Sequence, residues 1–234
     1  MCGRFLLTAD PRALADYFTL PDFPAQMPRY NIAPGQNVPV VVEADGARLL
    51  RTMRWGLVPS WAKDAAVGFR SINARSETAA DKPVFRAAFR RRHCLVPASG
   101  FYEWRASGKK KQPMLFRPRE GLFAFAGLWE TWQDGAVKLE TCAVLTTAAN
   151  GLVRPLHDRM PAVLDPKDFA AWLVPSGEKE RDLQLLRPYP ADAMTAAEAN
   201  PWVNDARHEG PQCSEPPERE PSLFDGGGAY EPEA

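Results

Sequence analysis

LFAFAGLW at residues 122–129 and LETCAVLTT at residues 139–147 are runs of apolar, aromatic and β-branched residues, the composition of buried β-strands. Shorter runs of the same kind predict further strands at residues 38–42, 49–55, 94–96, 100–104 and 114–116. Asp10-Pro11 and Asp165-Pro166 each combine a helix N-cap with proline at the first helical position, so a helix is expected after each pair. A third helix is expected at about residues 82–92. Because strand-like runs dominate, we predict an α+β domain of antiparallel sheets with short helices packed outside.

Charge is unevenly distributed along the 234 residues, although the 29 acidic and 29 basic side chains balance. Six acids and one arginine lie from Pro211 onward, which leaves 23 acids and 28 bases in residues 1–210. A mildly basic body is compatible with nucleic-acid binding but does not demonstrate it. The proline, glutamate and glycine content of residues 211–234 predicts a disordered acidic tail after a single domain over residues 1–210.

The sequence has neither the apolar stretch of a secretory signal at its start nor an apolar run of membrane-spanning length. We therefore expect a cytoplasmic protein. The four cysteines are far apart and form no C-x-x-C pair, which argues against a zinc ribbon. All four are expected to be unpaired, with Cys94 and Cys142 buried as small hydrophobic residues. No metal or cofactor signature is present, so none is expected, and a monomer is the default expectation.

Cys2 has the most distinctive chemistry in the sequence. Aminopeptidases remove Met1 when the second residue is small, and the product would have an α-amine and a thiol on adjacent carbons. The amine has a pKa of about 7.7–8.0, so part of it is neutral at pH 7 and can attack an aldehyde to give a Schiff base. The thiol can then close a five-membered thiazolidine ring, which an internal cysteine cannot form. The opposing interpretation is that a cysteine at position 2 is accidental.

Three further segments contain polar groups suited to such chemistry. Residues 71–77 (SINARSE) form a polar stretch that includes Asn73. In residues 100–104 (GFYEW), strand alternation predicts that Glu103 shares a face with Phe101, which would raise the pKa of the carboxyl and suit it to general acid–base catalysis. The alternative is a water-facing glutamate on an edge strand. Residues 157–161 (HDRMP) contain His157, whereas His93 and His208 are expected to be structural.

Basic and aromatic residues alternate along much of the chain, as in proteins that bind single-stranded nucleic acid through a basic groove and stacking rings. The residues concerned are Arg4, Arg54, Trp55, Trp61, Arg70, Arg75, Phe85, Arg86 and residues 90–92. The lysine run at residues 109–111 is expected to form a solvated hairpin turn instead of a DNA contact.

Taken together, the ordered motifs of the chain resemble the SRAP family, which was named for SOS-response-associated peptidases and is understood as a family of abasic-site DNA–protein crosslinkers. The matching motifs are CGRF at 2–5, YNIAPG at 30–35, RWGLVP at 54–59, INARSE at 72–77, PASGFYEW at 97–104, GLW at 127–129, TTAAN at 146–150, HDRMP at 157–161 and VN at 203–204. They cover nearly all of the chain up to about residue 210, and the ordered set is far more specific than any single motif.

The resemblance implies a distorted antiparallel β-barrel-like core and covalent bonding to abasic sites in single-stranded DNA. It implies that Cys2 is the nucleophile, that Asn73 orients it and hydrogen-bonds the sugar, that Glu103 moves the proton during Schiff-base formation, and that His157 helps to open the closed sugar. Arg4, Arg75 and Arg159 resemble phosphate ligands. Asn31, Pro34 and Trp61 resemble residues that line the bound strand.

Other functions remain open on the sequence alone. The same Cys, Asn, Glu and His could serve an N-terminal-cysteine peptidase or amidohydrolase, and the protein could remove its own Met1. A non-catalytic single-strand-binding module is a third reading, and abasic-site lyase activity through Glu103 is a secondary one. Residues 221–224 (PSLF) resemble the end of a sliding-clamp-binding peptide, which would recruit replication-fork proteins, and the competing interpretation is a featureless tail.

Overall fold

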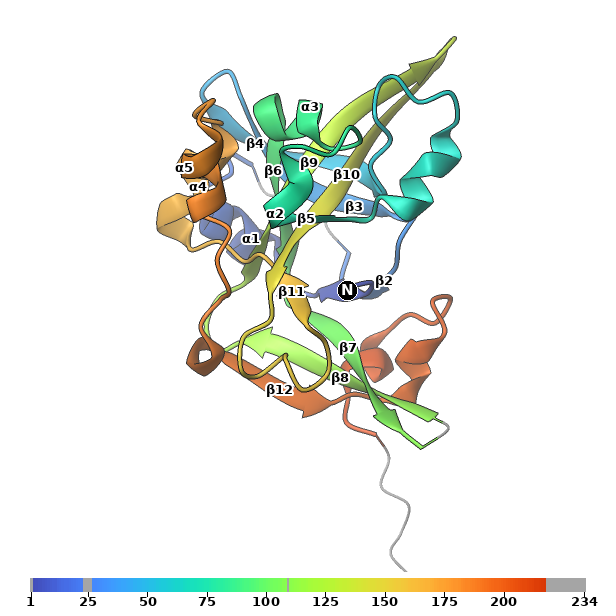
Figure 1. Cartoon of the computed structure of the whole chain (residues 1–234). Helices are drawn as coiled ribbons and strands as arrows, with labels where there is room; N and C mark the ends of the chain where they lie inside the picture. Colours follow the sequence, from blue (N-terminus) through green and yellow to red (C-terminus); the bar gives the residue numbers. More distant parts are fainter. Residues whose placement is uncertain (1, 23–26, 109, 218–234) are drawn as a thin grey trace, which may run out of the picture.

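The computed structural model describes residues 2–22, 27–108 and 110–217, and its main feature is a closed barrel (Figure 1). The barrel strands are β3 (Asn37–Ala44), β4 (Ala47–Trp55), β6 (His93–Ala98), β9 (Phe123–Asp134) and β10 (Val137–Ala148). They run in the order β10-β4-β3-β6-β9, and β9 pairs with both β6 and β10, which closes the ring. These pairings are antiparallel except that of β10 with β4, which is parallel. The predicted barrel-like core is confirmed, with one parallel seam in place of a fully antiparallel ring.

A second, antiparallel sheet packs against the barrel (Figure 1). Its strands, in order, are β12 (Met194–Glu198), β8 (Lys110–Pro118), β7 (Gly100–Ser107), β1 (Phe5–Leu7) and β2 (Arg29–Ile32). Phe5 of β1 contacts the barrel at Trp55, with ring centroids 5.2 Å apart, and Phe101 of β7 lies 6.1 Å from Phe125. These rings join the two sheets in one hydrophobic core.

The opposite face of the second sheet has a smaller core of its own. Because successive strand residues point to opposite faces, Leu6 and Tyr102 leave the main core and pack with Leu115, Val203 and Cys213. The last two residues come from the 3₁₀ helices η4 (Pro201–Asn204) and η5 (Pro211–Ser214). The short strand β1 therefore lies between two cores, which fixes the position of the residues just before it.

The chain beyond residue 210 differs from the expected tail. Residues 211–217 are part of the folded domain, because Cys213 is fully buried and the Asn200 N–H donates to the Glu215 carbonyl (2.8 Å). The buried residue that anchors this segment is a single cysteine in an acidic, proline-rich stretch. A prediction from composition misses it, because one cysteine hardly changes the composition of the segment. Residues 218–234, including the proposed clamp-binding segment 221–224, lie outside the described residues.

Two short strands pair with the second half of β10. β5 (Asn73–Arg75) is parallel to it, with Asn73 opposite Val144, and β11 (Arg159–Pro161) is antiparallel to it, with Arg159 opposite Ala148. β10 therefore brings the segment around Asn73 and the segment around His157 to the same end of the barrel.

The helices are short and lie outside the sheets, as predicted. They are α1 (Pro11–Phe18), α2 (Ser76–Ala79), α3 (Arg86–Arg91), α4 (Phe169–Leu173) and α5 (Lys179–Gln184), with further 3₁₀ helices η1 (Ala65–Arg70), η2 (Pro166–Asp168) and η3 (Ala191–Ala193). The Asp10 and Asp165 carboxylates accept hydrogen bonds from the N–H groups two residues later, as N-caps do. The third predicted helix begins at Arg86 instead of Lys82: Pro83 disfavours helical backbone at Lys82, and residues 83–85 form a turn.

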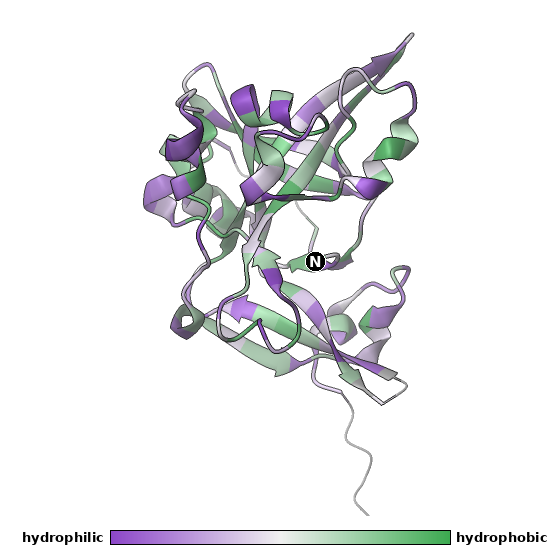
Figure 2. Cartoon of the chain, in the orientation of Figure 1, coloured by the Kyte–Doolittle hydropathy of each residue, from purple (hydrophilic) through white to green (hydrophobic). Residues whose placement is uncertain are grey.

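Hydropathy follows this arrangement (Figure 2): hydrophilic residues cover the outer helices α3 and α5, and hydrophobic residues concentrate on the barrel strands. Within the described part of the chain, no helix has both the length and the apolar character needed to cross a membrane. Cys94 and Cys142 are fully buried, as predicted, and all four cysteines are unpaired.

Candidate active site

Cys2 lies three residues before β1, where the barrel and the second sheet meet. Only 1% of its surface is exposed. Its Sγ is 3.7 Å from the Arg4 carbonyl oxygen, to which the thiol donates. Burial, together with the negative charge of Glu103, raises the pKa of the thiol well above its ordinary value. The thiol is therefore protonated at neutral pH.

Asn73 holds Cys2 directly. Its side-chain Nδ2 donates to the Cys2 carbonyl oxygen (2.7 Å). The strand that carries Asn73 is fixed from both sides, because the Ile72 carbonyl accepts hydrogen bonds from the Val144 N–H (3.0 Å) and from the Trp55 indole (2.8 Å). The Oδ1 atom of Asn73 is buried and has no hydrogen-bond partner among the described residues. The amide thus orients residue 2 with one end and offers an unused acceptor with the other.

Glu103 is buried beside the same residues. The Tyr102 N–H donates to the Arg4 carbonyl (2.9 Å), so β7 runs alongside the start of the chain, and the next residue, Glu103, is only 6% exposed. Burial raises the pKa of the Glu103 carboxyl. The sequence-based expectation of a desolvated acid on the Phe101 face is confirmed, and the alternative of a water-facing edge glutamate is wrong because β7 has neighbours on both sides.

His157 lies just before β11, partly exposed. Its Nδ1 is 2.9 Å from the Arg159 N–H and also 2.9 Å from an Asp158 carboxylate oxygen. The two contacts need opposite protonation states, because Nδ1 must be bare to accept from Arg159 and protonated to donate to Asp158. We favour acceptance, since burial lowers the pKa of His157 and the Asp158 side chain is 81% exposed. The neutral ring then carries its proton on Nε2.

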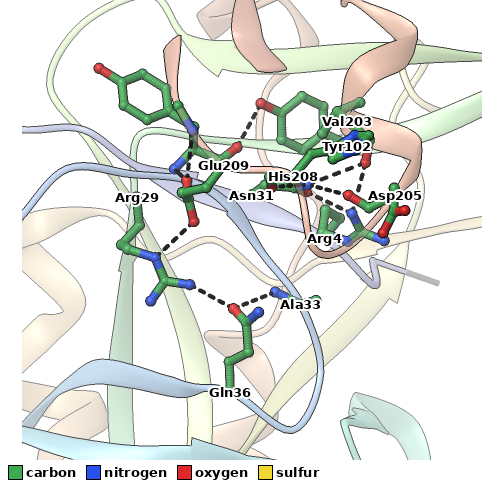
Figure 3. A network of polar contacts seen from close by, with 12 residues as sticks. Arg4, Arg29, Asn31, Ala33, Gln36, Tyr102, Val203, Asp205, His208 and Glu209 are labelled. Carbon is green, nitrogen blue, oxygen red and sulfur yellow. Dashed lines mark hydrogen bonds and ion pairs between the residues drawn. The ribbon is translucent and has the colours of Figure 1, made fainter. Parts of the chain in front are cut away.

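The predicted DNA ligands Arg4 and Asn31 are engaged inside the protein (Figure 3). Arg4 Nη1 donates to Asn31 Oδ1 (2.6 Å) and to the Val203 carbonyl (2.8 Å). Asn31 is fully buried, and its Nδ2 lies 2.9 Å from the Asp205 carbonyl and 2.8 Å from that of His208. Asn31 therefore does not line a surface for DNA in this structure: it links β2 to the segment that follows η4.

Arg159 and Arg75 occupy contrasting environments. The Arg159 guanidinium donates to both Glu77 carboxylate oxygens (2.5 and 2.8 Å) and to the Thr146 carbonyl, and its side chain is only 10% exposed. Arg75, the residue opposite Thr146 on β5, is exposed. Of the predicted phosphate ligands, Arg75 is the one that faces solvent. Pro34 is half-buried, and Trp61 is 61% exposed.

Several residues around the site were not singled out from the sequence. Trp104 lies under the Arg4 guanidinium, 5.7 Å from it, and Glu77 forms the ion pair with Arg159. Both belong to motifs quoted above, but an aromatic residue or an acid in a short motif has no individual signature. Trp202, beside the VN motif, is 42% exposed and stacks on His208.

A cavity of about 510 Å³ opens between η1 and the segment before α3. Its lining residues are Asp64, Ala66, Val67, Arg70, Ser71, Lys82, Val84 and Phe85. Neither Cys2 nor Glu103 lines this cavity, so it is separate from the cluster around Cys2. No group of three or more His, Cys, Asp or Glu side chains among the described residues is arranged to hold a metal ion.

Sequence comparison links the chain to known proteins. The profile of a family described as SOS response associated peptidase (SRAP) matches residues 1–206. "Abasic site processing protein YoqW" of Bacillus subtilis (strain 168) is 39% identical over 222 residues, which cover 92% of this chain and 99% of the relative. "Abasic site processing protein HMCES" of Xenopus tropicalis is 30% identical over 218 residues, which cover 80% of this chain and 65% of the relative.

Solved structures share the fold. A crystal structure of a protein from Bacteroides thetaiotaomicron matches with a TM-score of 0.83 at 24% identity, covering 92% of this chain and 99% of that one. A protein from Bordetella bronchiseptica matches with a TM-score of 0.75 at 26% identity, covering 85% of this chain and all of that one. The barrel with its accompanying sheet is thus an arrangement found in other proteins.

Proposed function

The chain belongs to the SRAP family, and from this we propose that it processes abasic sites in single-stranded DNA by bonding to them covalently through Cys2. The family membership and the names of the relatives support abasic-site processing. The observation that carries the chemical part is the 2.7 Å hydrogen bond from Asn73 to the Cys2 carbonyl, which fixes residue 2 beside a buried carboxyl.

The bond-forming sequence begins after Met1 is removed. The neutral α-amine of Cys2 attacks the C1′ aldehyde of the ring-opened sugar, and loss of one water gives an imine. The Cys2 sulfur then bonds to the imine carbon while the thiol proton passes to the nitrogen, which closes a thiazolidine ring. The complete reaction joins protein and DNA with the loss of one water molecule and needs no oxidant, reductant or cofactor.

The surrounding residues have distinct parts in this proposal. Glu103, with a pKa raised by burial, gives a proton to the departing hydroxyl during imine formation and can take one back. The unused Oδ1 of Asn73 accepts a hydrogen bond from the amine or from a sugar hydroxyl. Neutral His157, protonated on Nε2, helps to open the closed sugar. Exposed Arg75 and Trp61 contact the flanking strand.

The alternative of an N-terminal-cysteine peptidase is less well supported. A cysteine that attacks an amide carbonyl acts as a thiolate, and reactive cysteines have lowered pKa values. Burial and Glu103 act in the opposite direction on Cys2. Addition of the thiol across an imine transfers its proton to the nitrogen, so this step needs no separate base. Lyase activity is a secondary possibility that shares the imine, because the imine makes the neighbouring sugar proton acidic and Glu103 could remove it.

The test is intact mass spectrometry of untagged protein, first confirmed to begin at Cys2, mixed with single-stranded DNA bearing one abasic site. We expect an adduct equal to protein plus DNA minus one water. DNA with a tetrahydrofuran in place of the abasic sugar has no aldehyde and should give none. Cys2→Ala keeps the amine but lacks the thiol, so its adduct should survive only when the imine is reduced with borohydride.

The outcomes separate the candidate functions. Absence of an adduct from protein that begins at Cys2 would overturn the proposal. Turnover on peptides that depends on Cys2 would favour the peptidase. Equal binding of abasic and intact strands without any covalent product would favour a non-catalytic single-strand-binding module.

A further inference from the structure

Trp202 and His208 form a stacked pair on the surface, which we call the aromatic platform. Their ring centroids are 3.5 Å apart and their planes differ by 6°. His208 Nδ1 is 2.7 Å from the Trp202 carbonyl oxygen, and because a carbonyl can only accept, Nδ1 carries a proton and donates it. Trp202 remains 42% exposed. A large ring is therefore held flat against a second ring while much of its surface faces solvent.

Asn31 holds the loop that presents the aromatic platform (Figure 3). Its buried Nδ2 donates to the carbonyls of Asp205 (2.9 Å) and His208 (2.8 Å), and lies 3.4 Å from that of Val203. Its Oδ1 is in turn fixed by Arg4. One buried amide thus ties three backbone groups of the loop to β2, so the platform is preorganised before any ligand arrives.

The aromatic platform lies close to the start of the chain. Val203, the neighbour of Trp202, accepts a hydrogen bond from Arg4 Nη1 (2.8 Å), and Arg4 is two residues from Cys2. The same Arg4 guanidinium lies over Trp104, 5.7 Å from the ring centroid. Arg4 therefore joins the loop that carries the platform to the segment that carries Cys2.

The charges on this loop do not favour a phosphate as the group that meets the platform. Arg207 is paired with Asp205 (2.5 Å), and Arg29 is paired with Glu209 (2.9 Å). The loop therefore presents the exposed ring of Trp202, and the two arginines near it are neutralised by ion pairs. Among the parts of a DNA strand, the nucleobase is the one that binds a ring face, because every base has a π surface.

We propose that the aromatic platform binds one unpaired nucleobase of the strand that flanks the abasic sugar, and that Asn31 is the positioning residue of this site. The proposal rests on the proposed function, since it takes single-stranded DNA as the substrate. Stacking on aromatic rings tolerates any base, so the platform adds affinity without sequence preference. It also fixes the register of the strand, because a base on Trp202 sets how far the next sugars extend toward Cys2.

The experiment uses single-stranded DNA without an abasic site, with 5-iodouracil placed at each position of the strand in turn. Irradiation should join one position, or two adjacent ones, to the peptide that contains Trp202, as identified by mass spectrometry. Trp202→Ala should raise the Kd for the strand about tenfold, whereas Trp202→Phe, which keeps a ring, should raise it much less. Val137→Ala, at a 60% exposed apolar residue in the β9–β10 hairpin, is the matched control and should leave the Kd unchanged.

Asn31→Asp tests the positioning role, because it replaces the donors that hold the three carbonyls with an acceptor. We expect it to lower the photo-crosslink yield at Trp202 although Trp202 is present. Circular dichroism and thermal unfolding would show whether the fold survives, and if it does not, Trp202→Ala and Trp202→Phe still decide the matter.

The adduct assay on abasic DNA, run on the same protein, separates this inference from the proposed function. A normal adduct together with no photo-crosslink at Trp202, or an unchanged Kd for Trp202→Ala, would overturn the platform and leave the proposed function standing. A missing adduct would overturn the proposed function. Photo-crosslinking at Trp202 that is lost in Trp202→Ala, with the Kd raised, supports the platform whatever the adduct assay gives.

Discussion

Glu103 combines two properties that usually exclude each other in a stable protein, namely burial and a titratable carboxyl. General acid–base groups typically contribute about 10²- to 10⁴-fold to a rate. We therefore expect Glu103→Gln to slow adduct formation with abasic DNA by about that factor, as measured by single-turnover kinetics on denaturing gels. The Gln side chain is similar in size and should preserve the position of Cys2. A rate within about threefold of the wild type would contradict the proton-transfer role.

The same substitution should stabilise the protein at neutral pH. Burial raises the pKa of Glu103 above its ordinary value of 4.5, so the folded state binds the proton more tightly than the unfolded state. The stability associated with Glu103 is thus fully present below pH 4.5 and is lost as pH rises through the raised folded pKa. Thermal unfolding at several pH values should show Glu103→Gln gaining about 0.5–2 kcal/mol at pH 7 and little at pH 4. A gain that does not depend on pH would show that charge burial is not the cause.

Arg75 and Arg159 should respond differently to substitution by alanine. Arg75 is exposed, so its loss should change stability by less than about 0.5 kcal/mol. It should also reduce the salt dependence of single-strand binding by about 0.7 in the slope of log K against log salt, the contribution of one phosphate contact. Arg159→Ala leaves the Thr146 carbonyl without its donor and should cost about 1–3 kcal/mol of stability. Fluorescence anisotropy at several salt concentrations, with thermal unfolding, measures both. An unchanged salt slope for Arg75→Ala would remove it from the DNA surface.

The structure brings Cys2, Asn73 and Glu103 together. Cys2 and Glu103 had been selected for what their functional groups can do, whereas the part given to Asn73 came from the resemblance to the family. Asn31 shows the limit of that reasoning. An asparagine is usually exposed, and this one is buried because carbonyls from residues more than 170 positions later surround its amide. No local pattern reports a contact made at that sequence separation.

At the level of secondary-structure elements, the position of η1 depends on two glycines. Gly56, after β4, has φ of +134°, and a Cβ on it would lie 2.7 Å from the Gly68 carbonyl oxygen. We expect Gly56→Ala to displace η1 and to cost about 2–4 kcal/mol, as measured by denaturant unfolding. Gly135 is the control, because it also has positive φ (+55°) but nothing within 4 Å of an added Cβ. Gly135→Ala should therefore cost only the backbone strain, about 1 kcal/mol. Equal losses at the two positions would exclude the backbone contact as the cause.

The long strands and the capped helices could be predicted from the sequence, and the three-residue strands could not. β9 and β10 are each 12 residues long, and α1 has both its N-cap and its first proline. β1, β5 and β11 have three residues each, too few for any periodicity to register. Their strand conformation comes from their partners: β5 and β11 exist because β10 extends far enough to pair with both. Asn73 lies in β5, and Cys2 and His157 lie just before β1 and β11, so three of the four site residues depend on these short strands.

On the scale of the whole molecule, the C-terminal segment covers the smaller core. A variant chain that ends at Gly210 would lose Cys213 and expose one side of Leu6 and Tyr102. We expect its Tm to fall by about 5–10 °C relative to a chain that ends at Pro217, which corresponds to about 2–3 kcal/mol for a protein of this size. Differential scanning calorimetry of the two chains measures this. Equal Tm values would show that the stable domain ends at residue 210, as the composition suggested.

The burial of Cys2 also has a consequence for the timing of protein synthesis. β1 reaches its final position only when β7, which begins at Gly100, is available to pair with it. At about 5–20 residues per second, a ribosome needs roughly 5–20 s to make the intervening chain. During that interval the first residues are open to an aminopeptidase, and afterwards Cys2 is 1% exposed. Under the proposed function, slower translation lengthens this interval and should raise the fraction of chains that have lost Met1 and have a free Cys2 amine.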